Sequence, residues 1–377
     1  MNEYNFLSRG YRKFCQLEIE SLLCMRTLLF LISGFKKASG AVLTIIIFAC
    51  FLAVILNQSY AEDSGQNNAQ FQWDIKSDYQ FALKQNNKIV WQFNAEPSNA
   101  SKPYFDPLCV VGCKSLSLPD PSDHPWHLGH WFSWKYINGV NYWETDKKGI
   151  AQGETFWSKP RRVLNRNGSA SIFLEVGYRP RKSKSDQVLP LVKEQREIII
   201  SVPEIDGSYI LDWVQEFTAM EDVTFDRTAI PGEKNGVDWG GYAGLSIRFS
   251  NELREVKTVA ANSAKLHRRK NNCLDFYDAD GVEQNGVIDG REYGIAILSH
   301  PDSQYGRNWY VIEEKNFTYI NAATLLHGAV KLSKGEVLKL CHRVHVHKGR
   351  WDAVKLNEAA SKYKLTSPKI SEKVLPK

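Results

Sequence analysis

Residues 123–144, DHPWHLGHWFSWKYINGVNYWE, bring together three histidines, four tryptophans and two asparagines. Imidazoles exchange protons near neutral pH, so His124 and His127 are candidates for acid–base catalysis. Aromatic side chains offer flat apolar surfaces on which the C–H face of a sugar ring can stack, while polar neighbours bond its hydroxyl groups. Trp126 and Trp131 are therefore candidates for substrate binding. The composition of this run indicates a ligand pocket that contains acid–base groups.

The same run also has a purely structural explanation, in which the tryptophans fill the core and the histidines have structural partners. Pro125 disfavours helix at His124, so we expect a structured loop that leads into the strand HWFSWKYI. Trp131 and Trp134 lie three apart in that strand, so they cannot both face the core. We expect one of them to be exposed or to line a cleft.

Residues 337–349, VLKLCHRVHVHKG, alternate in the manner of a β-strand. Side chains two apart on a strand share a face, so His342 packs with aliphatic neighbours while Arg343, His345 and His347 share the other face. A guanidinium beside imidazoles suits an anionic or polyhydroxylated ligand. We assign an acid–base role to His347 and substrate binding to Arg343 and His345. The alternatives are a solvated sheet face, or a metal site formed by the last two histidines and one loop histidine.

Carboxylates give weaker signals than the histidines do. Glu216 lies mid-strand on the less apolar face of residues 208–220, where it is either paired structurally or an acid–base group, and we include it among the catalytic candidates. Glu144 closes the aromatic run, where it could simply cap the segment. The carboxylate pair of an ordinary glycosidase cannot be assigned. The glycines of residues 240–244 lack phosphate-cradle spacing and predict a bulge or a close approach of the backbone to a ligand instead.

Period-2 alternation of apolar and polar residues dominates from residue 71 onward. Turn signals such as Asn167-Gly168 and Asp206-Gly207 separate these runs. Short strands with such turns predict one all-β domain over residues 71–354, a large antiparallel β-sandwich with few helices. The one helical candidate is LNEAASKYKL, residues 356–365, within a basic C-terminal tail that spans residues 355–377.

The N-terminal residues 1–61 have the features of a targeting segment. Lys36 and Lys37 precede the apolar run AVLTIIIFACFLAVIL, and Ser59-Tyr60-Ala61 provides small residues at both positions that a signal peptidase reads. We expect cleavage after Ala61, with an uncleaved membrane anchor as the alternative. Residues 62–70 are polar and predict a disordered linker. The bulk of the chain is therefore expected to be exported, periplasmic or extracellular, with the membrane contacted only through this segment.

Charge and cysteine content limit the possible partners. The chain of 377 residues has a formal net charge of +6, of which +3 lies in the first 61 residues, so nothing indicates nucleic-acid binding. Export permits disulfides, and their pairing stays open. We expect no cofactor, and the oligomeric state stays unassigned. The cysteines that follow the targeting segment are Cys109, Cys113, Cys273 and Cys341.

Three sequence blocks resemble a known family. Residues 123–144 resemble the histidine–aromatic motif of exported bacterial proteins labelled "methane oxygenase PmoA", and GGYAGLSIR and CHRVHVHKG resemble its later blocks in the same order. The resemblance implies a large β-sandwich similar to the galactose-mutarotase type and a place in polysaccharide degradation. His130 and the segment GRNWYVIEEKNF depart from the family pattern. Carried over by motif, the implied site residues are His124, His127, Asn138, Gly241, Gly244, Arg343 and His347, with Asn138 binding substrate.

Together these patterns predict an exported carbohydrate-active protein. Its cleft would form where the loop at 123–144 meets the polar face of the strand at 337–349. The predicted reaction is acid–base chemistry on a sugar, which includes anomerisation, elimination and hydrolysis. The alternatives are a carbohydrate-binding module without catalysis and a metalloprotein with a histidine-rich site. Enzyme class and substrate stay open.

Overall fold

A computed structural model describes residues 71–97, 101–181, 189–262, 265–270 and 272–371. The predicted targeting segment and the predicted linker lie outside these residues. Within the described part of the chain, no helix is long and apolar enough to cross a membrane.

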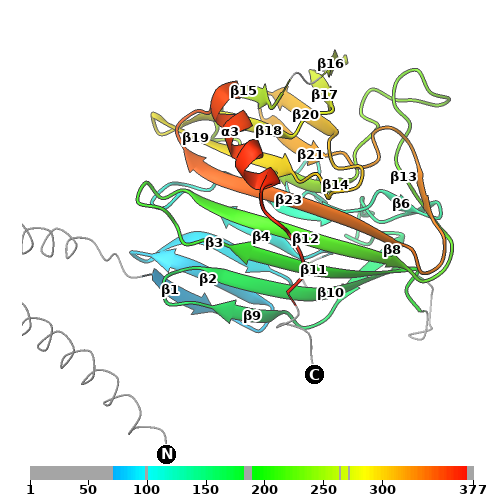
Figure 1. Cartoon of the computed structure of the whole chain (residues 1–377), viewed down its shortest axis with the longest axis horizontal. Helices are drawn as coiled ribbons and strands as arrows, with labels where there is room; N and C mark the ends of the chain where they lie inside the picture. The colour runs from blue at the N-terminus through cyan, green and yellow to red at the C-terminus, as the bar shows by residue number, and fades with distance from the viewer. Residues whose placement is uncertain (1–70, 98–100, 182–188, 263–264, 271, 372–377) are drawn as a thin grey trace, which may run out of the picture. The chain divides into compact units, whose positions relative to one another are not determined.

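Two large sheets contain most of the described strands (Figure 1). The first is ten-stranded and runs β1 (Phe71–Ile75), β2 (Gln80–Gln85), β3 (Lys88–Asn94), β4 (Tyr104–Leu108), β5 (His130–Ser133), β14 (Gly244–Arg248), β21 (Phe317–Ala322), β20 (Trp309–Glu314), β17 (Cys273–Tyr277) and β16 (Lys265–Arg268). The second is nine-stranded and runs β15 (Arg254–Ala260), β18 (Gly281–Ile288), β19 (Arg291–Ser299), β23 (Val337–Lys348), β12 (Tyr209–Ala219), β11 (Val192–Ile200), β10 (Ala170–Pro180) and β8 (Gly153–Trp157), with β9 (Arg161–Leu164) also paired to β10.

A small sheet closes one end, in the order β22 (Val330–Leu332), β13 (Val223–Asp226), β6 (Tyr136–Ile137) and β7 (Val140–Asn141). Every strand pair of the described residues is antiparallel. The predicted class, a large antiparallel β-sandwich with few helices, is confirmed.

The two large sheets pack face to face over a shared apolar core. Trp213 of the nine-stranded sheet lies 5.9 Å from Phe105 and 5.1 Å from His130 of the ten-stranded sheet, measured between ring centroids. The alternation predicted for β23 is confirmed, because His342, Val344 and the other members of that face are buried in this core. Since successive side chains of a strand point to opposite faces, each large sheet also has an outer face.

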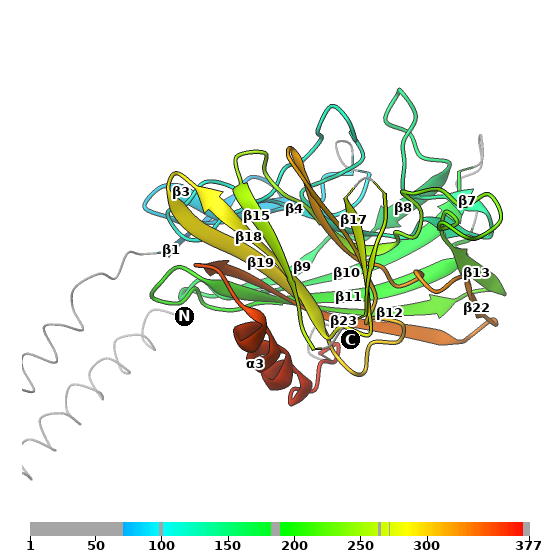
Figure 2. The ribbon, with the colours of Figure 1, turned by 90° about the horizontal axis from the view of Figure 1, so that it is seen from above.

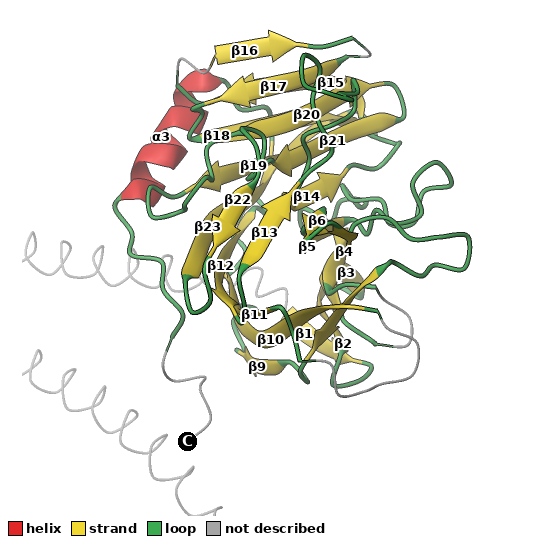
Figure 3. Cartoon of the chain, turned by 90° about the vertical axis from the view of Figure 1, so that its right-hand side faces the viewer, coloured by secondary structure: helices red, strands yellow, loops and turns green. Residues whose placement is uncertain are grey.

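The described helix α3 (Ala353–Lys364) covers part of the outer face of the nine-stranded sheet (Figures 2 and 3). It begins three residues before the predicted segment, because the side chain of Asp352 accepts a hydrogen bond from the backbone of Lys355 and caps the helix. Leu356, Ala360 and Tyr363 recur at helical spacing and pack into a cluster with residues of β19. The segment predicted as a tail thus contributes to the fold.

Trp131 lies in β5 and Trp134 directly follows it. Their side chains point to opposite faces of the sheet, yet both are fully buried. Trp134 lies in the core between the sheets, and Trp131 lies in a second cluster on the outer face of the ten-stranded sheet. The expectation that one of them is exposed or lines a cleft is wrong, because loops fold over this outer face and cover Trp131. The same loops create the site described below.

No disulfide joins the cysteines of the described residues. Cys109 and Cys341 are buried, and burial raises the pKa of both thiols to about 12. Cys273 belongs to the cluster on the outer face of the ten-stranded sheet, and its Sγ lies 3.3 Å from the hydroxyl of Tyr310.

Candidate functional site

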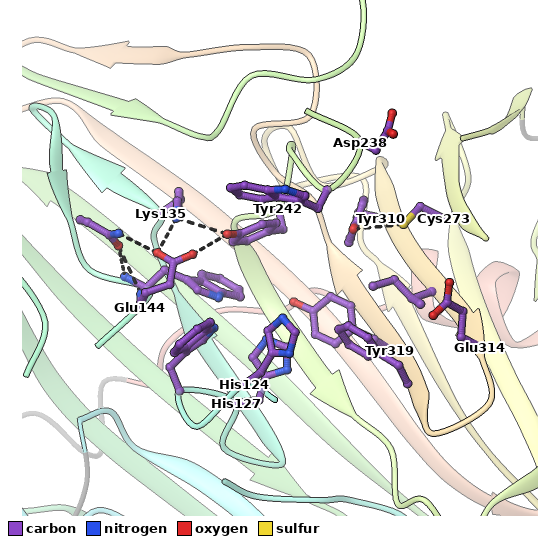
Figure 4. Close-up of a pocket in the computed structure, with 16 residues that line it drawn as sticks. His124, His127, Lys135, Glu144, Asp238, Tyr242, Cys273, Tyr310, Glu314 and Tyr319 are labelled. Atoms are coloured by element: carbon purple, nitrogen blue, oxygen red, sulfur yellow. Dashed lines mark hydrogen bonds and ion pairs between the residues drawn. The ribbon is translucent and has the colours of Figure 1, made fainter. Parts of the chain in front are cut away.

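A cavity of about 580 Å³ lies on the outer face of the ten-stranded sheet (Figure 4). Alternation along β20 builds its floor, because Tyr310, Ile312 and Glu314 face the cavity while Val311 packs between the sheets. The loops before β5, after β7 and before β14, together with residues of β17 and β21, supply the other walls. The lining residues are His124, Trp126, His127, Lys135, Asn141, Trp143, Glu144, Asp238, Trp239, Tyr242, Cys273, Tyr310, Ile312, Glu314, Phe317 and Tyr319.

Glu144 is held in place by three side chains at one end of this cavity (Figure 4). Asn141 donates to its Oε2 at 2.6 Å, Tyr242 donates to its Oε1 at 2.5 Å, and Lys135 forms an ion pair with it. Burial raises the pKa of Glu144, but the charge of Lys135 and the three hydrogen bonds outweigh burial and hold the pKa below its ordinary value. Glu144 is therefore an ionised hydrogen-bond acceptor in a fixed position at neutral pH.

The loop before β5 has the structured turns predicted from Pro125. The backbone N–H of His124 donates to the carbonyl of Pro121, and that of His127 donates to the carbonyl of His124, both at 2.9 Å. These two successive turns bring both imidazoles onto the same wall of the cavity, 4.8 Å apart between ring centroids.

His124 is oriented by a chain of polar contacts. Its Nδ1 lies 2.9 Å from Oδ2 of Asp123, and the buried guanidinium of Arg248 donates to the same oxygen at 3.0 Å. Burial raises the pKa of Asp123, but the hydrogen bond with His124 and the charge of Arg248 outweigh burial and lower it. Because an ionised Asp123 accepts the proton of Nδ1, Nε2 is the nitrogen left for a ligand. This is the arrangement that an oriented general base or acid requires.

His127 lies deeper and is surrounded by rings. It stacks on Tyr319 with 5.2 Å between centroids and lies 4.9 Å from Trp131. Burial is the main cause that holds the pKa of His127 well below its ordinary value, and the nearby His124, Arg248 and Lys102 act in the same direction. His127 is therefore neutral at physiological pH and forms part of the aromatic wall.

Lys102 lies behind this wall and donates a hydrogen bond of 3.0 Å to the carbonyl oxygen of Trp143. Burial lowers the pKa of Lys102 from 10.5 to about 8, although the charge of Glu144 opposes this shift. Because the folded pKa is the lower one, the charged form destabilises the folded state below pH 8. That cost disappears as the pH rises from about 8 to about 10.5.

We therefore expect Lys102→Met to gain stability relative to the natural protein at pH 7 but not at pH 11. The difference in free energy of unfolding between the two proteins should change by about 3 kcal/mol over this range. Chemical denaturation at both pH values measures it. Lys88→Met, at an exposed position, is the control and should show almost no change. An equal difference at both pH values for Lys102→Met would contradict a lowered pKa.

A buried ion pair anchors the loop that carries Asp238 and Tyr242. Nε of Arg269 donates to Oδ2 of Asp275 at 2.6 Å, and both side chains are 1% exposed. Nη1 of Arg269 donates to the carbonyl oxygens of Gly240, at 2.7 Å, and Asp238, at 3.2 Å. The sheet thereby fixes the position of this wall.

The glycines of this loop lie very close to neighbouring backbone, while the bulge or close approach to a ligand expected there stays a prediction. A Cβ on Gly240 would lie 2.1 Å from the carbonyl oxygen of Ala229, and one on Gly244 would lie 2.2 Å from that of Ala322. The φ of Gly244, 129°, is also a value that side-chain-bearing residues rarely adopt. These glycines let the loop pass close to its neighbours on the way into β14.

The shared cleft predicted between the loop and the last strand is wrong. Arg343, His345 and His347 line a separate cavity of about 340 Å³ under α3, on the outer face of the nine-stranded sheet. His347 stacks on Trp351 at 4.2 Å, and Arg343 forms two hydrogen bonds of 2.7 Å with Asp212. The loop histidines lie on the opposite outer face, so the sandwich separates the two groups. A role for the strand residues in ligand binding or catalysis stays a prediction.

Three further candidates lie away from the lining of the large cavity. Trp131 is fully buried beneath His127 and has no surface free for a sugar ring. Asn138 lies in the turn between β6 and β7, where its side chain bonds the backbone of Thr224 and Asp222. Glu216 lies in the nine-stranded sheet, opposite Lys339 of β23. The structure brings His124, Trp126 and His127 together on the cavity wall. Trp131, Asn138 and Glu216 do not join them there.

No three His, Cys, Asp or Glu side chains of the described residues lie close enough together to hold a metal ion. The alternative of a metal site formed by His345, His347 and a loop histidine is wrong, because the two sheets lie between these residues.

Sequence reasoning missed most of the polar lining. Glu144 was considered only as a cap, and Lys135, Tyr242 and Glu314 were not considered. Lys135 is a charged residue within an aromatic run, which was a usable signal, since a buried lysine needs a partner. Lys135 also bonds the hydroxyl of Tyr242, which is 107 residues away in sequence. No local pattern predicts such a contact.

A family model described as "Family of unknown function (DUF6807)" matches residues 80–361. The chain belongs to this family. The match includes every wall of the large cavity, the whole of β23 and most of α3. The label "methane oxygenase PmoA" stays a resemblance of the motif blocks.

A search of curated proteins finds no match. Among solved structures, AgaB, a GH36 α-galactosidase from Geobacillus stearothermophilus, is similar with a TM-score of 0.39 and 10% identity, covering 73% of this chain and 40% of that chain. A galactose mutarotase related enzyme from Lactobacillus acidophilus has a TM-score of 0.34 and 6% identity, covering 74% of this chain and 97% of that chain. The chain spans less than half the length of the GH36 enzyme, and its similarity to both solved structures is one of fold alone.

Proposed function

We propose that the large cavity binds a sugar residue of a glycan and that His124 acts there as an acid–base group. The observation that carries this proposal is the combination of an aromatic lining with polar anchors at two places, the fixed carboxylate of Glu144 and the oriented imidazole of His124. A sugar needs both kinds of surface, because its C–H faces are apolar and its edges carry hydroxyl groups. The volume of about 580 Å³ lies in the range of small-ligand sites.

Each anchor has a distinct role in the proposal. Glu144 is ionised and accepts hydrogen bonds from hydroxyl groups, which orients the ring. Nε2 of His124 exchanges a proton with the bound sugar, while Asp123 keeps the proton of the ring on Nδ1. The reaction belongs to the acid–base class that includes anomerisation, elimination and hydrolysis. Export through the N-terminal segment is part of the proposal and rests on the sequence of residues 36–61.

The exposed rim offers the first test. Trp239 lines the cavity with 53% of its surface exposed, so its ring is available for stacking on a sugar. We expect Trp239→Ala to weaken the binding of whichever glycan the natural protein binds by about fivefold, which corresponds to about 1 kcal/mol. Calorimetry over a glycan panel, with product analysis by chromatography, measures binding and chemical change together.

Tyr305 provides a matched control, because it is equally exposed at 53% and lies outside this cavity. Tyr305→Ala should leave the affinity unchanged. Equal losses in the two variants, or a panel in which no glycan binds, would contradict the proposal. Saturable binding without any product would instead favour a carbohydrate-binding module.

A further inference from the structure

The cavity carries an excess of negative charge. Three carboxylates line it, from Glu144, Asp238 and Glu314, against a single lysine, Lys135. His127 adds no positive charge, because its lowered pKa keeps it neutral. We propose that the cavity selects sugars without negative charge, favours amino-substituted sugars and excludes uronic acids and sulfated sugars. This inference rests on the proposed function and names its substrate class.

The cations near the cavity are already engaged. Lys135 is 3% exposed and is paired with Glu144. Arg248 is 1% exposed and is paired with Asp123. Arg269 is also 1% exposed and is paired with Asp275 of β17. Among the described residues that line the cavity, none is a lysine or arginine left over for the carboxylate or sulfate of a sugar acid.

The carboxylates of Asp238 and Glu314 are in the opposite situation. Neither side chain has a hydrogen bond or ion pair with another described residue, although both residues line the cavity. Figure 4 shows them on the side of the cavity away from Glu144. The aromatic lining of the cavity strengthens the field that these charges exert on a ligand, because low-polarity walls screen charges less than water does. An ammonium group would be attracted to this side and a carboxylate repelled.

The test compares methyl glycosides that differ in one group. Methyl glucoside is compared with the matching glucosaminide and glucuronide, and the galactose series repeats the comparison. With the natural protein, we expect the uronide to bind at least about tenfold more weakly than the neutral sugar, and the amino sugar to bind at least as tightly. Calorimetry at low ionic strength gives the affinities.

Two variants locate the cause. The double variant Asp238→Asn and Glu314→Gln should bring the uronide and neutral affinities to within about threefold of each other. Glu313→Gln is the matched control, because it makes the same change one residue away, on the opposite face of β20, and should leave the preference intact.

A uronide that binds the natural protein as tightly as the neutral sugar overturns the inference while leaving the proposed function in place. A preference that is unchanged in the double variant also overturns it. If no sugar of either series binds the natural protein, the proposed function fails and this inference fails with it.

Discussion

Arg269→Met is expected to lower the free energy of unfolding by about 3–5 kcal/mol, because it leaves the carboxylate of Asp275 buried without a counter-charge. His267 lies 3.4 Å from the same carboxylate oxygen, but its side chain is 60% exposed on β16 and cannot replace a buried guanidinium. Denaturant unfolding measures the loss. Lys159→Met removes an equally short but exposed ion pair with Asp78 and should cost less than about 1 kcal/mol.

The double variant Arg269→Met and Asp275→Leu separates stability from the site. Removing both charges should restore most of the lost stability, since apolar residues can replace a buried ion pair at little cost. It should not restore glycan binding, because the hydrogen bonds of Arg269 to the carbonyl oxygens of Asp238 and Gly240 are still missing. A single variant that unfolds like the natural protein would contradict the buried pair, and a double variant that binds normally would contradict the anchoring of the loop.

Local periodicity was sufficient to predict several of the strands and the buried face of β23. On β23 the alternation separated His342, which is in the core, from Arg343, His345 and His347, which are not. Such a pattern records which side chains share a face, and that is a property of a few neighbouring residues. It also gave the antiparallel sandwich class, because many short alternating runs with tight turns permit few other architectures.

The same information could not place two strands relative to each other. β5 and β23 belong to different sheets, so the polar face of β23 and the loop before β5 lie on opposite outer faces. Either strand would show the same alternation in either sheet. The prediction of a shared cleft needed the sheet order, which depends on pairings between residues far apart in sequence.

Burial of Trp131 shows a second limit. Its side chain was correctly assigned to the face opposite that of Trp134, but a face that is outside the sandwich can still be covered by loops. Here the rings of His127 and Trp143 pack against it, with centroids 4.9 Å and 5.9 Å from that of Trp131. The exposed aromatic surface of the cavity belongs instead to residues such as Trp239, which a loop without periodicity supplies.

His124→Ala is expected to lower the turnover of a confirmed glycan substrate by about 10²–10⁴-fold, the usual contribution of an acid–base group. Among the described residues, Nε2 of His124 has no hydrogen-bond partner, while Nδ1 is held by Asp123. The binding affinity should fall much less than turnover, because Glu144 and the aromatic walls remain. Steady-state kinetics and calorimetry on the same substrate distinguish these two effects.

Asp123→Asn should also lower turnover, because the neutral amide no longer stabilises the proton on Nδ1 and the ring can adopt the other tautomer. His267→Ala is the control, since that histidine is exposed and lies outside the cavity. The His124→Ala variant tests proton transfer by the imidazole, and the Asp123→Asn variant tests whether Asp123 must orient that imidazole. Turnover that survives His124→Ala would remove this histidine from the chemistry, and would leave Glu144 and its partners as the groups that any reaction in the cavity must use.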